Sequence, residues 1–306
     1  MKISLHLGAH KTASTYLQTA LERNADLLAA RRVGFVPLDD LRAEVTRRVW
    51  QRPGWDAERQ AKAVRQAEAF LEPQLRRDDI DRLILSDENL IGTPGEIVLG
   101  GQLYPDVAAR LGALPGLLAG HEVEIFLAVR PLINFTRSIY CESLRAPLPE
   151  FTEPEAFRAA WDRNAPDWGQ VIRRIRGAFP DSPITLWSHA MVRSDAGALL
   201  NLLSGLEDSP GYDLEQIYRR PSLSQRATEA LLEIGRGDGT RAMAEAATDL
   251  NRAHPLGEGN RQYMLWPRPR MRKDRLAWPD TYAALAGAAP GVRVLPLPSE
   301  DGAISR

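Results

Sequence analysis

The stretch from residue 3 to residue 21 constrains the fold most strongly, because its hydrophobic pattern changes period in the middle. Ile3, Leu5 and Leu7 alternate with other residues, as in a short β-strand, and Gly8 then breaks the pattern. The apolar residues that follow recur at helical spacing, at Tyr16, Leu17, Ala20 and Leu21. The sequence therefore predicts a strand, a short loop and a helix.

The loop between this strand and this helix is rich in small and hydroxyl-bearing residues. Such a loop directs several backbone N–H groups and the N-terminus of a helix at one place, which favours an anion and above all a phosphate. Lys11 adds a full positive charge, and Thr12, Ser14 and Thr15 add hydroxyl groups. The alternative is an ordinary strand–turn–helix junction with a surface lysine.

The spacing excludes the loop that binds nucleoside triphosphates. That loop has four residues between two glycines and then Gly-Lys-[Ser/Thr]. Here Lys11 follows Gly8 by three residues, and no glycine directly precedes it.

Residues 11–15, Lys-Thr-Ala-Ser-Thr, instead resemble the 5′-phosphosulfate loop of sulfotransferases that use 3′-phosphoadenylyl sulfate (PAPS), whose pattern is Lys-[Ser/Thr]-Gly-[Ser/Thr]-[Ser/Thr]. Four of the five positions match. Ala13 stands at the family's glycine, so we expect the backbone there to avoid a positive φ angle. The resemblance implies that residues 11–15 bind the cofactor and that Lys11 stabilises the leaving phosphate. Tyr16 stands where the family often places an aromatic residue near the adenine.

A second informative stretch is the apolar strand at residues 83–85, which runs into Ser86, Asp87 and Glu88. In open α/β sheets, ligands bind outside the carboxyl ends of the strands. Bacterial sulfotransferases look similar here, with a strand that ends in Ser-x-Glu. For the general base we favour Glu88, then His10, whose neutral form the charge of Lys11 would favour, and then Asp87. The alternative is that one of the two acids caps a helix.

The strongly apolar strand at residues 122–130 suits the centre of a parallel sheet and ends at Arg130. Ser138 follows eight residues later, inside an expected helix. In the sulfotransferase family an Arg at a strand end and a Ser eight residues on hold the 3′-phosphate of the cofactor. The resemblance implies that role for Arg130 and Ser138. Arginine suits this role, because its planar guanidinium can donate hydrogen bonds to two phosphate oxygens at once.

The remaining helices and strands are predicted from local hydrophobic patterns and from one capping residue. Residues 167–179 and 196–203 have helical patterns around a strand at 184–187, and Ser224 is a plausible N-cap for a helix over 225–236. Residues 257–260 and 266–273 are expected to form a loop with four basic residues. In sulfotransferases a late basic segment often closes over the cofactor, and the alternative is a solvated basic loop. Residues 292–296 are expected to add an edge strand.

Composition narrows the class of protein. The 306 residues are 44% hydrophobic and carry a net charge of −1, so no overall basic field attracts nucleic acid. A single cysteine, Cys141, excludes an internal disulfide and a cysteine-based zinc site. We see no signal peptide and no membrane-spanning segment, and we expect a cytoplasmic protein.

Together these features predict one α/β domain over residues 1–306, with a central, mostly parallel sheet flanked by helices and insertions near 40–80 and 237–275. The predicted activity is transfer of a sulfuryl group from PAPS to a hydroxyl or amine of a small-molecule, glycan or lipid acceptor, with no metal ion. A nucleotide kinase related to the P-loop enzymes, or a non-catalytic nucleotide-binding relative, is the alternative. The sequence identifies neither the acceptor nor the oligomeric state.

Overall fold

The computed structural model describes residues 1–208, 211–215, 222–257 and 259–298. Its centre is one sheet of six strands, all parallel, in the order β2-β3-β1-β4-β5-β6. The strands are β1 (Lys2–His6), β2 (Val33–Phe35), β3 (Arg82–Ser86), β4 (Glu122–Val129), β5 (Ile184–Ser188) and β6 (Val292–Val294). The predicted α/β class with a parallel sheet is confirmed.

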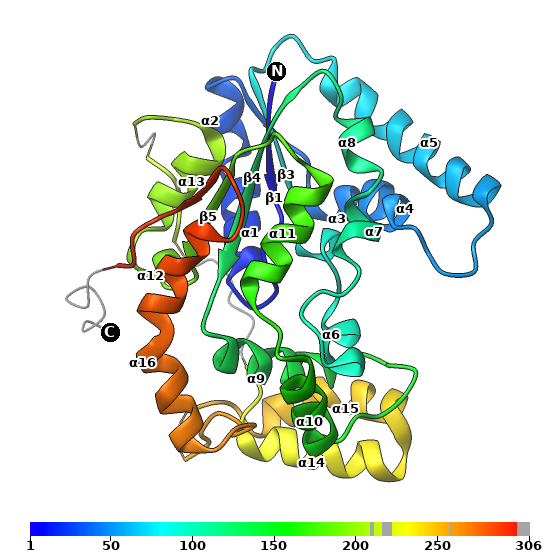
Figure 1. The fold of residues 1–306 in the computed structure, drawn as a ribbon, viewed down its shortest axis with the longest axis vertical. Coiled ribbons are helices and arrows are strands. Elements are labelled where there is room, and N and C mark those ends of the chain that lie inside the picture. Colours follow the sequence, from blue (N-terminus) through cyan, green and yellow to red (C-terminus); the bar gives the residue numbers. More distant parts are fainter. Residues whose placement is uncertain (209–210, 216–221, 258, 299–306) are drawn as a thin grey trace.

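Helices cover both faces of the sheet (Figure 1). The first half of the chain contributes α1 (Ser14–Arg23), α2 (Ala25–Ala30), α3 (Leu38–Leu41), α4 (Arg47–Val49), α5 (Ala57–Leu75), α6 (Pro94–Gly100), α7 (Val107–Leu111), α8 (Leu114–Leu117) and α9 (Leu132–Ser143). The second half contributes α10 (Pro154–Asn164), α11 (Trp168–Ala178), α12 (Met191–Ser194), α13 (Ala196–Ser204), α14 (Gln225–Gly237), α15 (Gly239–Ala253) and α16 (Arg268–Ala284). A π-helical turn spans Arg42–Thr46, and 3₁₀ turns span Glu88–Leu90 and Leu285–Gly287.

Both faces of the central strands are buried, as a parallel sheet covered by helices requires. Side chains alternate between two cores because successive residues of a strand point to opposite faces. Leu85 and Leu127 belong to the larger core, which α9 and α11 help to close. Ile84 and Phe126 belong to the smaller core, under α1, α2 and α13. The inner parts of β3 and β4 are therefore apolar on both sides, which explains their continuous hydrophobic runs, whereas β1 places Ser4 and His6 on the side opposite Ile3 and Leu5.

Strand β1 lies between β3 and β4, so the loop that follows it is at the point where the order of the strands reverses. In open α/β sheets this is where ligands bind. Below the carboxyl ends of the strands, in the orientation of Figure 1, lie α9, α10, α14 and α15. The loop after β1 thus faces a second group of helices.

Most local predictions are confirmed, including β6 at the edge of the sheet and Ser224 as the N-cap of α14, where its hydroxyl accepts from the N–H of Ala227. The loop expected at residues 266–273 is wrong, because α16 begins at Arg268. Two prolines in this stretch, Pro267 and Pro269, lie at the N-cap and in the first turn of α16. Proline is tolerated there because the N–H groups of the first turn have no partner within the helix.

In the described part of the chain, no helix is both long enough and apolar enough to cross a membrane.

The buried His6 makes stability depend on pH. Burial lowers its pKa from 6.5 to about 3, and its ring stacks on Trp187 while Nδ1 lies 2.8 Å from the Ser86 hydroxyl. The unfolded chain therefore binds a proton below pH 6.5 that the folded chain rejects, and stability is lost as the pH falls from there toward 3. We expect His6 to contribute about 2 kcal/mol to the loss between pH 7 and pH 4.5. Urea unfolding of wild type and His6→Gln at both pH values measures this share; equal losses in the two proteins would contradict it.

Candidate active site

The start of the loop after β1 is hydrogen-bonded to the neighbouring strand β4. The N–H of Leu7 donates to the carbonyl of Phe126, and the N–H of Ala128 donates to the carbonyl of Gly8. Gly8 has a φ of 67°, and a Cβ there would lie 2.7 Å from Cβ of Glu88 and 2.7 Å from Oγ of Ser14. A glycine is therefore required by both backbone conformation and space. This close approach places the first loop directly against the residues that follow β3.

The expectation that Ala13 avoids a positive φ angle is wrong. Ala13 has φ 70° and ψ 27°, the left-handed conformation, and it is the N-cap of α1. Lys11 also has a positive φ, of 61°. The left-handed conformation costs a residue with a Cβ about 1–2 kcal/mol, so the surrounding bonds must impose it. The loop thus keeps a glycine-like conformation without the glycine.

This conformation leaves donors pointing out of the loop. The N–H groups of Tyr16 and Leu17 both donate to the carbonyl of Ala13. For the N–H groups of residues 11–15, we find no acceptor within the described residues. Free N–H groups at a helix N-terminus favour an anion.

The hydroxyl groups of the loop divide into two kinds. Thr12 is fully buried, and its hydroxyl donates to the carbonyl of Ala9 at 2.6 Å. Ser14 donates to the same carbonyl at 3.1 Å but still lines the main cavity of the molecule, together with Thr15 and Tyr16. The side chain of Thr12 thus stabilises the loop from within, whereas the other two hydroxyl groups face the cavity.

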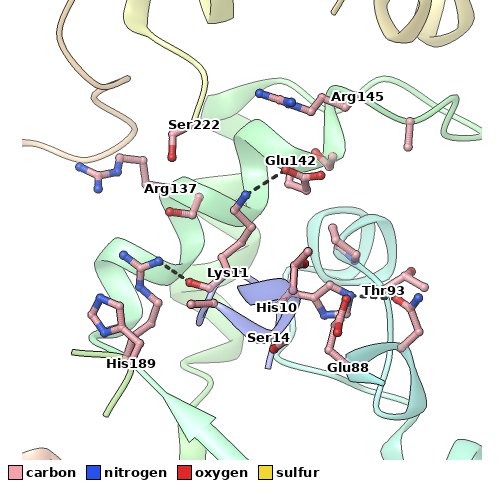
Figure 2. Close-up of a pocket in the computed structure, with 18 of the residues that line it drawn as sticks. His10, Lys11, Ser14, Glu88, Thr93, Arg137, Glu142, Arg145, His189 and Ser222 are labelled. Atoms are coloured by element: carbon pink, nitrogen blue, oxygen red, sulfur yellow. Dashed lines mark hydrogen bonds and ion pairs between the residues drawn. The ribbon is translucent and has the colours of Figure 1, made fainter. Parts of the chain in front are cut away.

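The main cavity has a volume of about 610 Å³ and unites the two predicted parts of the site. Lys11, Arg130 and Ser138 all line it. Figure 2 shows Lys11 in this cavity with its ammonium directed at Glu142. A guanidinium nitrogen of Arg130 donates to the carbonyl of Lys11 at 2.6 Å, which ties the end of β4 to the loop. The ammonium of Lys11 lies 3.1 Å from Oε2 of Glu142 on α9. The first loop and the Arg130–Ser138 pair, more than a hundred residues apart in sequence, therefore share one cavity.

Positive charge is concentrated around Arg130. Burial, and then the neighbouring guanidinium groups of Arg137 and Arg193, lower the pKa of Arg130 to about 10. Burial is also the main cause that lowers the pKa of Arg137. All three arginines line the cavity, and none has an ion-pair partner among the residues that the structure describes. Nε of Arg130 and Nδ1 of the adjacent His189 are buried without a hydrogen-bond partner. This cluster of guanidinium groups is therefore suited to binding a doubly charged anion.

Glu88 lines the opposite side of the cavity, at the carboxyl end of β3. Its Oε2 accepts from the amide of Gln18 at 3.0 Å, and its Oε1 accepts from Arg42 at 3.3 Å. These two donors fix the carboxylate, and each oxygen keeps a lone pair that can accept a further proton donor. Glu88 is therefore oriented and accessible from the cavity.

Asp87 has a different environment. It is fully buried, and its Oδ1 accepts from Arg42 at 2.7 Å and from the backbone N–H of Asn89 at 3.0 Å. It thus caps the 3₁₀ turn at Glu88–Leu90, as the alternative interpretation of this stretch proposed. Its side chain does not line the cavity.

His10 is part of a hydrogen-bond chain. Its Nδ1 lies 3.0 Å from the hydroxyl of Tyr104. The amide of Asn89, oriented to satisfy its neighbours, donates to Nε2 of His10 at 3.0 Å and accepts from Nε of Arg42 at 2.8 Å. Both ring nitrogens are therefore engaged. Burial is the main cause that lowers the pKa of His10, against the opposing effects of Glu88, Asn89 and Asp87. The neutral form is favoured as expected, but by burial rather than by Lys11.

The polar side chains that line the cavity and that sequence reasoning missed include Arg42, Thr93, Arg137, His189 and Arg193. A signal existed for His189, which directly follows β5 at the same edge of the sheet as Arg130. Arg42 gave none, because a π-helical turn in a helical region brings it to the end of β3. The described residues include no cluster of three or more His, Cys, Asp or Glu side chains that could hold a metal ion.

Comparison with known proteins gives one structural likeness to report. A sulfotransferase from Alicyclobacillus acidocaldarius, solved as a crystal structure, is 14% identical and aligns over 79% of this chain and 94% of its own, with a TM-score of 0.40. No protein-family model matches the chain, and no curated protein matches it.

Restoring the glycine that the loop conformation calls for should stabilise the protein. Ala13→Gly removes a Cβ from a left-handed position, and we expect the free energy of unfolding to rise by about 0.5–1 kcal/mol after the larger entropy of the unfolded glycine is subtracted. Urea unfolding measures the change. Ala20→Gly, in the interior of α1, is the matched control and should destabilise by about 1 kcal/mol or more. A loss of stability in Ala13→Gly would show that the left-handed conformation carries no strain.

Proposed function

We propose that the protein transfers a sulfuryl group from PAPS to an acceptor. The observation that carries the proposal is that one cavity has two separate sites for anions. One is the loop of residues 11–15, with its unpaired N–H groups and Lys11. The other is the cluster of Arg130, Arg137 and Arg193, whose charges have no acidic partner in the described part of the chain. A nucleotide with phosphate groups at both its 5′ and 3′ positions matches this arrangement.

The residues present fit the donor. The N–H groups of residues 11–15, with the hydroxyls of Ser14 and Thr15, would hold the 5′-phosphate. Arg130 and Ser138, with Arg137 and Arg193, would hold the 3′-phosphate, and the unpartnered Nε of Arg130 supplies one donor for it. Tyr16 lines the same cavity and offers an aromatic face for the adenine. PAPS would supply the sulfuryl group, which passes to the acceptor oxygen or nitrogen as its bond to the 5′-phosphate oxygen breaks.

Lys11 and Glu88 divide the chemical work. The ammonium of Lys11, held at the cavity wall by Glu142, would stabilise the negative charge that grows on the phosphate oxygen. Glu88 would take the proton from the acceptor, in an orientation fixed by Arg42 and Gln18. His10, with both ring nitrogens engaged, is assigned a positioning role between Asn89 and Tyr104.

The nature of the bound nucleotide separates this proposal from a kinase. Wild type should bind adenosine 3′,5′-bisphosphate more tightly than ATP with Mg²⁺ in calorimetry, because only the bisphosphate has a second phosphate for the cluster of Arg130, Arg137 and Arg193. Arg130→Ala should weaken the binding of the bisphosphate by about 2–4 kcal/mol, the scale for removing one partner of a desolvated charge pair. Because Arg130 also bonds the carbonyl of Lys11, the same substitution should weaken the binding of adenosine 5′-phosphate as well, but by less. Tighter binding of ATP with Mg²⁺ would favour the kinase.

Substitution of Lys11 and Glu88 tests the chemical step apart from binding. With labelled PAPS and a panel of acceptors, Lys11→Ala should abolish turnover, whereas Lys62→Ala on the exposed face of α5 should not change it. Glu88→Gln should keep the affinity for adenosine 3′,5′-bisphosphate and reduce kcat by roughly 10²–10⁴-fold, the usual contribution of a general base. Unchanged turnover in Glu88→Gln would remove Glu88 as the base, and bisphosphate binding without turnover in wild type would favour the non-catalytic relative.

A further inference from the structure

A second hollow of the molecule lies beside the main cavity. It has a volume of about 1340 Å³ and is formed by α9, by the segment of residues 261–264 and by the first half of α16; we call it the basic groove. Arg137 and Gln262 line both the groove and the main cavity, so the two hollows adjoin. Figure 1 shows α16 running down one side of the molecule toward the helices below the sheet.

The lining of the basic groove has six positive side chains and no acidic one: Arg137, Arg261, Arg268, Arg272, Lys273 and Arg275. None of the six has an ion-pair partner among the described residues. Arg270, on the same helix, lies outside the lining and is paired with Asp162. In a chain with a net charge of −1, such a cluster is local and not an effect of overall composition.

The one acidic residue in the first half of α16, Asp274, points away from the basic groove. It accepts from the backbone N–H of Ile133 at the start of α9. The indole N–H of Trp266 donates to the hydroxyl of Thr136 on the same helix at 2.8 Å. These contacts fix α16 against α9, so the positive side chains stand on a rigid support. A fixed set of unpaired cations is suited to an anionic ligand.

The shape and the apolar content of the groove narrow the ligand class. The groove is too large to be filled by a single phosphate. Its apolar residues include Met264, Met271 and Leu276, the last with 68% of its surface exposed, and they lie between the cations. A helical peptide would need a continuous apolar stripe instead. A guanidinium group can donate two parallel hydrogen bonds to a carboxylate or to a sulfate, so the groove suits a ligand that carries either group.

We propose that the basic groove binds an anionic oligosaccharide, carboxylated or sulfated. If the proposed function holds, this oligosaccharide is the acceptor. Arg137 and Gln262, which line both hollows, would direct its hydroxyl groups toward Lys11. The binding claim stands on the groove alone; only the word acceptor rests on the proposed function.

The test is fluorescence anisotropy with short labelled chains of oligogalacturonate and of dextran sulfate, and with neutral dextran of the same length. Wild type should bind both anionic chains, more weakly as salt is added, and should not bind dextran. Arg272→Gln/Arg275→Gln should weaken this binding about fivefold to tenfold. The matched control, Lys62→Gln/Arg65→Gln, removes two exposed charges at the same spacing on α5, far from the groove in Figure 1.

Equal losses in the two variants, or tighter binding of a poly-glutamate peptide than of either glycan, would overturn the proposal. The groove variant should keep wild-type affinity for adenosine 3′,5′-bisphosphate. Failure of wild type to bind that nucleotide would therefore count against the proposed function and leave glycan binding untouched. If wild type binds the nucleotide and turns over neutral acceptors but binds no anionic glycan, the proposal for the basic groove is wrong and the proposed function stands.

Discussion

The hydrogen bond from Arg130 to the carbonyl of Lys11 is the contact on which the site depends. It joins the end of β4 to the loop after β1, and it places a half-buried positive charge beside that loop. Two residues with a Cβ, Lys11 and Ala13, hold positive φ angles in that loop. Such a conformation persists only where the surroundings impose it, and here Arg130 from β4, together with the bonds from Thr12 and Ser14 to Ala9, imposes it.

The fold was largely predictable because its signals are local. Apolar runs give the central strands, and helical spacing with caps such as Ser224 gives the longer helices. The prediction failed at residues 266–273, where a loop was expected and α16 begins. Proline interrupts a helix but also begins one, so Pro267 and Pro269 give no clear local signal for either structure.

The candidate site was predictable only in part, for a related reason. Lys11, Arg130, Ser138 and Glu88 follow strand ends or precede helices, where local patterns indicate them, and all four line the cavity. Arg193 reaches the cavity from α12, and only the packing of the whole sheet places it beside Arg130. The conformation of Ala13 could not be read from its identity, because the bonds that impose it come from elsewhere in the fold.

The double role of Arg130 has a consequence for how the two ends of the cavity communicate. One guanidinium both ties the first loop in place and faces the cluster with Arg137 and Arg193. A molecule with an anionic group at each end would make its second contact at a high effective concentration once the first had formed. The protein would therefore select such molecules by a chelate effect. A molecule carrying both groups would bind more tightly than the separate affinities of the two single-anion fragments suggest.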